Sequence, residues 1–255
     1  MTHSRFSARL RASLGALALA ALAACTAVGE NPDEPAGYDP IEGVNRYVFE
    51  LNFAGDEFIL KPIAVIYRGT VPEPARQGVR NWLGNLRLPW TAINAALQGN
   101  WPRAGDAVVR FSVNSVVGFF GVFDPAKDMG YLQTEEDFGQ TMGVAGIGDA
   151  PYLMLPLIGP SNLRDTAGLV VDQLLDPVNL VARPGVNFKG NWFTYTRGGL
   201  SAIDQREANL EAIAELQRGS VDYYAAVRSA YRQLRRGAIQ NGPADKIQDV
   251  PGLFR

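Results

Sequence analysis

The stretch from Phe138 to Arg164 constrains the fold most, because it is apolar and yet cannot form a continuous helix. It contains five glycines and three prolines. In a helix each glycine costs about 1 kcal/mol relative to alanine, and each proline costs about 3 kcal/mol. The backbone must therefore be irregular and covered, either by protein as a buried crossover between helices or by lipid at a membrane interface. The candidate interfacial residues are Tyr152, Leu153, Met154, Leu155, Leu157 and Ile158.

The mature chain is predicted to contain no histidine, which limits its chemistry. His3 is the single histidine and lies in a segment that we expect to be removed, while Cys25 is the single cysteine. Serine–histidine and cysteine–histidine nucleophile systems, the usual zinc sites and histidine acid–base catalysis are thereby excluded. Catalysis by carboxylates or lysine stays open. We expect no catalytic residue, no cofactor and no metal site.

The charge balance argues against nucleic acid as a partner. The full chain carries a formal net charge of −2, and losing Arg5, Arg9 and Arg11 with the leader lowers it to −5. Nucleic-acid-binding domains carry a basic surplus instead. Because 47% of the 255 residues are apolar, the chain can build a real core.

Residues 1–24 are predicted to be a lipoprotein signal peptide. Arginines precede an apolar run from Leu14 to Leu22, which is too short to span a bilayer. The run ends in LAAC at residues 22–25, which is similar to the lipobox of bacterial lipoproteins, where the chain is cut before a cysteine that carries the lipid. Cys25 is therefore the expected lipidation site. In bacterial lipoproteins an aspartate directly after the cysteine usually retains the protein in the inner membrane. Thr26 occupies this position here, so the resemblance implies the outer membrane.

The rest of the chain divides into a tether, a helical domain and a tail. Residues 25–38 contain prolines, glycines and acids without an apolar period and are predicted to be a lipidated tether. Residues 39–236 carry helical periodicity, so we expect an all-α fold in a single domain with amphipathic and interfacial helices. Residues 237–255 are predicted to be a mobile tail. The sequence contains no internal repeat and no clear strand.

Caps and prolines predict the first helix boundaries. Asp39 is a plausible N-cap before Pro40, and Pro62 should kink or end that helix. A further helix is expected from Ala75 to Leu86. Three tryptophans would then fall at element boundaries beside arginines and are candidate interfacial anchors, although tryptophan more commonly caps a soluble core: Trp82, Trp90 and Trp101.

Trp101 to Phe123 is predicted to form one helix with an apolar second half. From Phe111 onward it carries no charge, and this half would span about 20 Å, which is less than the hydrocarbon core of a bilayer. We predict that Val116 to Phe123 is a movable gate beside a channel, the alternative being a static core helix. The candidate hinge residues are Val117, Gly118, Phe119, Phe120 and Gly121. Replacing both glycines with alanine should then favour helix and leave protein levels normal.

The second half of the helical domain is expected to contain three helices. They cover Thr166–Leu175, with caps from Ser161, Asn162 and Asp165, then Leu200–Gln217, and finally a helix capped by Ser220 that ends at Arg236. Residues 184–199 should be a connection. Four arginines crowd the end of the last helix, where they complement the helix dipole: Arg228, Arg232, Arg235 and Arg236.

Three long sequence blocks follow the lipobox. They read DPIEGVNRYVFELNF, RFSVNSVVGFFGVFDPA and DFGQTMGVAGIGDAPYLMLPLIGPSNLRD. In this order they resemble the signature of the MlaA (VacJ) family of Gram-negative outer-membrane lipoproteins, and the match extends from Tyr38 to about Arg236. The resemblance implies a helical ring, or doughnut, in the inner leaflet of the outer membrane, lipid-anchored on the periplasmic side, with an amphipathic channel. It also implies removal of phospholipid from the outer leaflet, association with trimeric porins, and transfer of the lipid to a soluble periplasmic carrier.

The sequence leaves three functions open. The first is a passive phospholipid conduit that maintains the lipid asymmetry of the outer membrane, since no GxxxxGK[ST] loop is present to use nucleotide. The second is a structural lipoprotein that only docks to a porin. The third is a histidine-independent phospholipase built on Asp or Glu with Ser. A dinucleotide loop at Gly143, Gly146 and Gly148 is disfavoured, because no strand precedes it and Pro151 interrupts the helix that should follow.

Overall fold

The computed structural model describes residues 39–149, 151–181 and 192–240. The described backbone is mostly helical, which confirms the predicted all-α class. Cys25, the leader, the tether and residues 241–255 of the predicted tail lie outside the described residues. The elements in chain order are α2 (Glu42–Gly55), the π-helical turn η1 (Asp56–Leu60), α3 (Lys61–Thr70), α4 (Glu73–Leu97), α5 (Trp101–Val116), α6 (Pro125–Asp128), α7 (Phe138–Val144), β1 (Tyr152–Leu155), β2 (Gly159–Asn162), α8 (Leu163–Leu175), α9 (Pro177–Val181), α10 (Trp192–Ala208), α11 (Leu210–Gly219) and α12 (Tyr223–Ile239).

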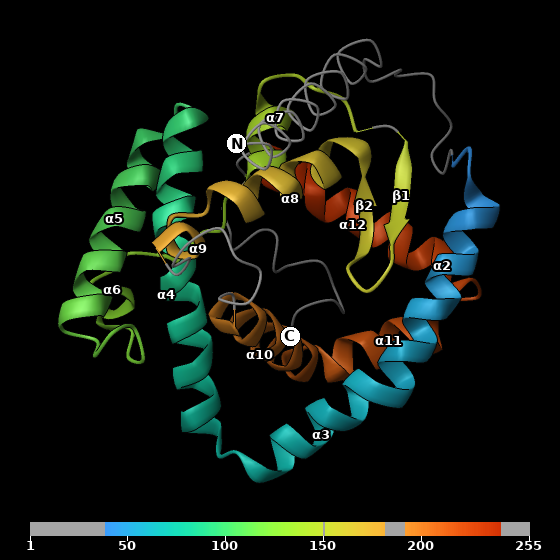
Figure 1. Ribbon diagram of the computed structural model, residues 1–255, viewed down its shortest axis with the longest axis horizontal. Helices are drawn as coiled ribbons and strands as arrows, with labels where there is room; N and C mark the ends of the chain where they lie inside the picture. Colours follow the sequence, from blue (N-terminus) through green and yellow to red (C-terminus); the bar gives the residue numbers. More distant parts are fainter. Residues whose placement is uncertain (1–38, 150, 182–191, 241–255) are drawn as a thin grey trace, which may run out of the picture.

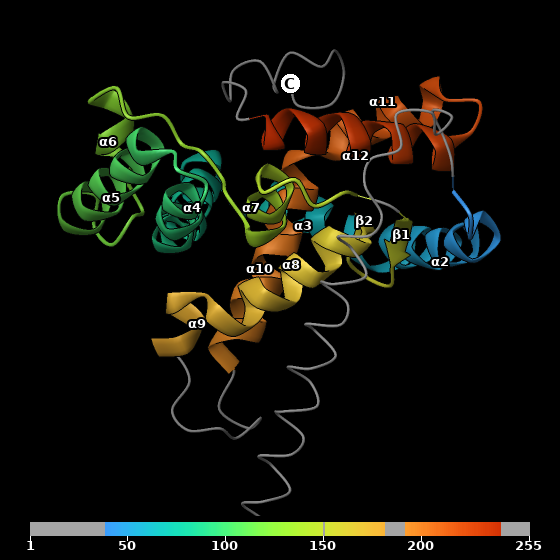
Figure 2. The ribbon, with the colours of Figure 1, turned by 90° about the horizontal axis from the view of Figure 1, so that it is seen from above.

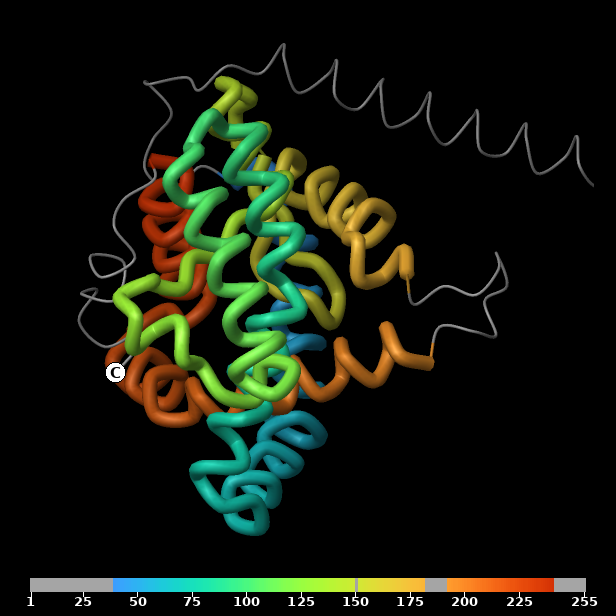
Figure 3. The backbone as a smooth tube through the Cα atoms, turned by 90° about the vertical axis from the view of Figure 1, so that its left-hand side faces the viewer, coloured from blue at the N-terminus to red at the C-terminus, as the bar shows by residue number. Residues whose placement is uncertain are grey.

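The helices form a ring (Figure 1). α2, η1, α3 and α4 follow one another around the circumference, and α8 with the β-hairpin lies across the remaining side. α10 runs from one face of the ring toward the other, while α11 and α12 lie together on one face (Figure 2). α5 packs along α4 outside the ring (Figure 3). None of the helices that the structure describes combines the length and the hydropathy needed to cross a membrane.

One side of the ring is a nearly continuous helical band with an apolar outer face. The predicted kink at Pro62 coincides with η1, a π-helical turn that carries the chain from α2 into α3, and the proline follows it in the first turn of α3. Asp56 in η1 pairs with Arg206 of α10 at 2.6 Å, which fixes the band to the interior helix. The large apolar side chains exposed on the band include Val44, Tyr47, Leu51, Phe58, Ile59, Ile63, Val65 and Ile66.

The ring is closed by contacts between its first and last described helices. Asp39, just before α2, accepts hydrogen bonds from the hydroxyl of Tyr224 on α12 and from Asn45 Nδ2 at 2.9 Å. Arg228 of α12 lies 3.3 Å from the same carboxylate. The N-cap position of α2 is Ile41 and not the predicted Asp39, and α2 begins at Glu42 without a side-chain cap, although Asp39 Oδ1 accepts a hydrogen bond from Ile41 N at 3.3 Å. Beside these contacts lies a buried apolar cluster made of Phe49, Tyr152, Met154 and Tyr224.

The stretch predicted to be irregular contains a two-stranded antiparallel hairpin, so the expectation of no strand was wrong. Tyr152 pairs with Asn162 and Leu155 with Gly159. Asparagine side chains of α2 form hydrogen bonds with the outer edge of β1. Asn45 Oδ1 accepts from Met154 N at 2.9 Å, and Asn45 Nδ2 donates to Tyr152 O at 3.1 Å. Asn52 Nδ2 donates to Leu155 O at 2.8 Å. A hairpin this short is marginal by itself, so these side chains complete its hydrogen bonding.

α4 runs through Pro89, and this corrects the predicted tryptophan positions. The helix extends from Glu73 to Leu97 instead of ending at Leu86. Trp82 and Trp90 therefore lie inside a helix and not at element boundaries, whereas Trp101 does begin α5. The helical cost of Pro89 is offset by packing, since α5 and α9 both contact α4.

α5 ends at Val116, so the predicted single helix to Phe123 was wrong. The chain reverses in a tight turn in which Gly121 N donates to Asn114 O at 2.8 Å and Phe123 N to Gly118 O at 2.9 Å. Phe119, Phe120 and Gly121 have φ angles of 52°, 58° and 89°. Such values favour glycine and exclude a helix. The apolar side chains around the turn are exposed, which also rules out a buried core helix: Val116, Val117, Phe119, Phe120 and Phe123.

The C-terminal helices differ from the prediction in their boundaries. Of the predicted connection at residues 184–199, residues 184–191 lie outside the described residues and residues 192–199 are the start of α10. The predicted helix from Leu200 to Gln217 breaks at Asn209. α12 is capped by Asp222, whose side chain accepts from Ala225 N at 3.1 Å, and not by Ser220. Asn162 caps α8 as expected, accepting from Asp165 N at 2.7 Å. Residues 237–239 of the predicted tail belong to α12.

Glycines allow α7, α8 and α12 to approach closely. A Cβ on Gly168 of α8 would lie 2.4 Å from Gly139 N, and one on Gly139 would lie 2.4 Å from Arg235 Nη2. A Cβ on Gly143 would lie 2.8 Å from Ile239 Cδ1. Backbone therefore packs against backbone where α8 meets α7, while Gly139 and Gly143 leave room for side chains of α12, so part of the glycine content that excluded a long helix serves helix packing.

Candidate functional site

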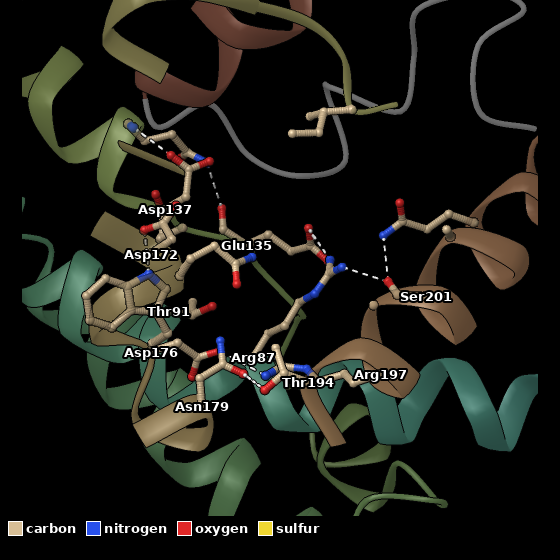
Figure 4. Close-up of a pocket in the computed structure, with 18 of the residues that line it drawn as sticks. Arg87, Thr91, Glu135, Asp137, Asp172, Asp176, Asn179, Thr194, Arg197 and Ser201 are labelled. Carbon is tan, nitrogen blue, oxygen red and sulfur yellow. Dashed lines mark hydrogen bonds and ion pairs between the residues drawn. The ribbon is translucent and has the colours of Figure 1, made fainter. Parts of the chain in front are cut away.

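A polar cavity of about 650 Å³ lies inside the ring (Figure 4). Helices α4, α8, α9, α10 and α12 supply most of its walls. Residues 135–137, which precede α7, also contribute to them. The side chains that line it are predominantly polar or charged, and they include Arg87, Trp90, Thr91, Glu135, Glu136, Asp137, Gln140, Asp172, Gln173, Asp176, Asn179, Thr194, Arg197, Ser201, Gln205 and Arg235. A smaller cavity of about 300 Å³ continues along α4 and α10 and shares Arg87, Glu135, Ser201 and Gln205 with it.

An apolar cavity of about 360 Å³, which is widely open to the surface, lies against the same helices. Its lining consists of Pro89, Phe111, Pro177, Val178, Val181 and Phe193. Adjacent residues on three elements face the two cavities: Pro89 and Trp90 on α4, Val178 and Asn179 on α9, and Phe193 and Thr194 on α10. The walls are thus shared, with polar side chains on one side and apolar side chains on the other.

The charged side chains of the polar cavity are mostly paired across neighbouring elements. Arg87 of α4 pairs with Glu135 at 3.2 Å and donates to Ser201 Oγ of α10 at 3.0 Å. Arg197 of α10 pairs with Asp176 at 2.9 Å. These contacts hold α10 against α4 and α9 around the cavity.

Arg235 of α12 pairs with two carboxylates from different elements. Its distances to Asp137 and Asp165 are 2.6 Å each. Burial raises the pKa of Asp137, but the hydrogen bonds and charge of Arg235, together with the hydrogen bonds from Gln140, hold that pKa below its usual value. The predicted role of Arg235 in complementing the helix dipole is thus replaced by a specific ion cluster that joins α12, α7 and α8.

Asp172 differs from the other carboxylates of the cavity, because the donors that hold it are neutral. Trp90 Nε1 donates to Asp172 Oδ1 at 2.7 Å, and Phe138 N donates to the same oxygen at 3.0 Å. Burial raises the pKa of Asp172 to about 6, against the smaller opposing effect of these two hydrogen bonds. Glu136, which is more deeply buried, also has its pKa raised by burial, but it pairs with Arg103 at 2.7 Å.

The predicted site residues are distributed over several places. Trp90 and Ile158 line the polar cavity, so Trp90 faces the inside of the ring and is not an interfacial anchor. Tyr152 and Met154 are 1% and 5% exposed in the protein core, which contradicts a membrane contact for these two. Leu153 and Leu155 are half-buried, and Trp82 packs edge-to-face on Phe193. Contact with the membrane stays a prediction for Trp82, Trp101, Leu153, Leu155, Leu157 and Ile158.

The predicted gate residues line neither of the polar cavities nor the apolar cavity. Gly121 instead packs against Asn85 of α4, and the turn is fixed by its own backbone hydrogen bonds. A hinge in a helix beside the channel is therefore not found at Val117–Gly121. Movement of the turn itself stays a prediction.

The polar cavity was not predicted from the sequence. One signal was available on α10, where Thr194, Arg197, Ser201 and Gln205 recur every three or four residues and so form a polar stripe on one helix face. A second was Asp172, a carboxylate within the mostly apolar run from Gly168 to Leu175. Neither signal shows by itself that these side chains meet, because the lining comes from elements that are distant in sequence.

Comparison with known proteins gives consistent matches. The family model described as MlaA lipoprotein matches residues 37–238. The intermembrane phospholipid transport system lipoproteins MlaA of Shigella flexneri and Escherichia coli K12 are 36% and 35% identical over 247 residues, which is 95% of this chain and 94% of each relative. A solved structure described as the structural basis for maintenance of bacterial outer membrane lipid asymmetry matches with a TM-score of 0.70 and 34% identity, covering 79% of this chain and 99% of that chain.

Proposed function

The chain belongs to the MlaA lipoprotein family, and from that premise we propose that it is a passive phospholipid conduit of the outer membrane. The relatives are named as lipoproteins of a phospholipid transport system, and the similar solved structure concerns outer-membrane lipid asymmetry. The proposed task is to remove misplaced phospholipid from the outer leaflet and so to maintain that asymmetry. The transport is passive and not enzymatic in this proposal.

The single observation that carries the proposal is the pair of cavities with shared walls. A phospholipid has a polar headgroup and apolar chains, and moving the headgroup through hydrocarbon is costly because its polar groups lose their hydrogen bonds. In the proposed path the headgroup travels along the polar cavity while an acyl chain lies in the apolar cavity on the other side of α4, α9 and α10. The headgroup of one lipid would thus stay solvated, while its acyl chain stays in apolar surroundings.

The exposed apolar surface supports a position within one leaflet. The outer face of α2, η1 and α3, the turn after α5 and Leu157 of the hairpin, which is 94% exposed, all present large apolar side chains. A surface this apolar is typical of membrane or protein contact. We propose that this face lies in the periplasmic leaflet of the outer membrane, with Trp101 at its edge. A trimeric porin and a soluble periplasmic lipid carrier are the proposed partners.

A direct lipid assay tests the proposal against the two alternatives. The purified protein in detergent is incubated with phospholipid labelled on its acyl chain. Intact bound lipid is the result expected of a conduit. Release of fatty acid would support a phospholipase instead, and the absence of both binding and release would support a protein that only docks to a porin.

Changing Val178 to Asp is expected to lower the amount of bound lipid about tenfold, because a carboxylate in the apolar cavity must lose its hydration when an acyl chain enters. Val178→Ile is the matched control, since it keeps the wall apolar at the same position. In cells V178D should let phospholipid accumulate in the outer leaflet, which lipid A palmitoylation reports. Equal lipid binding by both variants would remove the apolar cavity from the proposed path.

Cys25→Ala is expected to abolish anchoring. Without the thiol no acyl chains can be attached, and each buried methylene of such chains contributes about 0.8 kcal/mol to membrane binding. We expect unprocessed precursor and loss of the protein from the outer-membrane fraction. Mass spectrometry of the mature chain and membrane fractionation measure this, and an unchanged mass with normal fractionation would contradict the lipobox interpretation.

A further inference from the structure

The carboxylate of Asp172 is held in place with one oxygen left available. Both Trp90 Nε1 and Phe138 N bond to Oδ1. Oδ2 accepts no hydrogen bond from any residue that the structure describes, and Asp172 belongs to the lining of the polar cavity. Figure 4 shows Asp172 at the wall of the cavity, beside Asp137. Two neutral donors therefore orient an anionic group without neutralising it.

The other carboxylates of the cavity wall already have cationic partners. Glu135 pairs with Arg87, Asp176 with Arg197 and Asp137 with Arg235. Glu136 is paired with Arg103, which comes from α5. The cationic side chains of the wall are thus each occupied, and among the described residues Asp172 is the carboxylate of the wall without an ion pair. The unbalanced charge of the cavity is negative and is located on Asp172.

We propose that Asp172 binds the ammonium group of a phospholipid headgroup, so that the conduit prefers ethanolamine phospholipids over anionic phospholipids. This inference rests on the proposed function and names its substrate class. An ammonium carries N–H donors and a positive charge, which fit an oriented carboxylate oxygen. A glycerol headgroup offers hydroxyls without a charge, and its phosphate leaves the whole lipid anionic beside an anionic wall. The phosphate shared by both lipid classes does not discriminate between them.

The test is a competition between two lipids with identical acyl chains. The full-length lipidated protein is incubated in detergent with equimolar phosphatidylethanolamine and phosphatidylglycerol, and the bound lipids are quantified by mass spectrometry. We expect the wild type to enrich phosphatidylethanolamine about fivefold, the size expected for one partly buried ion pair. In Asp172→Asn the ratio should fall to about that of the input mixture. The amide oxygen can still accept from Trp90 and Phe138, so this variant should fold normally.

Glu135→Gln distinguishes binding at Asp172 from an effect of the total negative charge of the cavity. It removes the same charge from the same cavity, but its carboxylate is already paired and 61% exposed. A preference produced by Asp172 falls clearly further in D172N than in E135Q. Equal falls in both variants would show that the total charge of the cavity sets the preference, and the proposed site would be overturned.

A measurement on the unmodified protein keeps the proposal testable even if D172N does not fold. Soluble phosphoethanolamine and glycerol phosphate are compared as competitors of a bound labelled phospholipid, which also shows whether the headgroup alone is recognised. Phosphoethanolamine should displace the lipid at a severalfold lower concentration. Equal competition by the two compounds, together with equal binding of the two lipids, overturns the headgroup preference but leaves the conduit standing. If the wild type binds neither lipid, the proposed function itself fails.

Discussion

Arg235→Ala is expected to lower the free energy of unfolding by about 3 kcal/mol, which is the largest effect that we predict for a single substitution. The guanidinium lies 2.6 Å from both Asp137 and Asp165, and its side chain is 15% exposed. Removing one partner of a buried ion cluster leaves uncompensated charge, and such losses are typically about 3 to 5 kcal/mol. Because Asp137 is partly exposed, we expect the lower end of that range. Chemical denaturation in detergent measures the loss.

Arg236→Ala is the matched control for this prediction. Arg236 follows Arg235 on α12 but is exposed, so we expect a change of about 0.5 kcal/mol or less. A similar loss of stability in both variants would show that helix content, and not the ion cluster, is responsible.

The loss of stability should depend on pH in a defined direction. Since Arg235 holds the pKa of Asp137 below its usual value, this pair stabilises the fold above the pKa of an unfolded aspartate, and the contribution disappears as the pH falls through the lowered pKa. The difference between wild type and R235A should therefore be largest near neutral pH and should narrow in acid. A difference that stays constant from pH 7 to pH 3 would contradict a role for the ionised carboxylate.

Gly118→Ala is expected to destabilise the protein by about 2 to 3 kcal/mol, because the turn after α5 has no space for a side chain. A Cβ there would lie 2.4 Å from Phe123 O and 2.6 Å from Asn114 O, and both are backbone atoms. The turn must therefore shift as a whole. This reverses the effect predicted from the sequence, which was a more stable helix with normal protein levels.

Gly105→Ala is the control, in the helix that precedes this turn. Gly105 lies inside α5, and a Cβ there meets no atom within 4 Å. Alanine should therefore stabilise that position by up to about 1 kcal/mol. Thermal unfolding should separate the two variants by the sign of the change. Stabilisation by G118A would mean that the turn readily becomes helix, as a mobile gate requires.

The sequence predicted the helical class because helical periodicity is local, and it also predicted caps such as Asn162. It did not predict the hairpin, because β1 depends on Asn45 and Asn52, which lie more than a hundred residues away in α2. The predicted helix from Ala75 stopped at Leu86, before Pro89, whereas α4 continues to Leu97. The cost of a proline inside a helix is offset there by packing that only the tertiary structure supplies. The resemblance to a known family supplied the ring.

The candidate site was less predictable than the fold. Trp90 and Ile158 were singled out, but as membrane contacts and not as parts of a cavity wall. Asp172 differs from the other carboxylates because its donors, Trp90 and Phe138, are neutral, and these come from two other parts of the chain. A sequence shows which residues are polar, but it does not show which of them remain without a countercharge after folding.

The closure of the ring by Asp39 and α12 has a consequence for how the protein is made. The partners of Asp39 include Tyr224 and Arg228, which are 185 and 189 residues away along the chain. Contacts of such long sequence range form slowly, because a long loop must close before they contribute. When the chain forms from its N-terminus, β1 can pack on α2 before α12 is available, but the side of Phe49 that contacts Tyr224 stays uncovered until α12 has folded. A chain cut short before α12 would keep that surface open, so proteases and chaperones can distinguish an unfinished ring from a complete one.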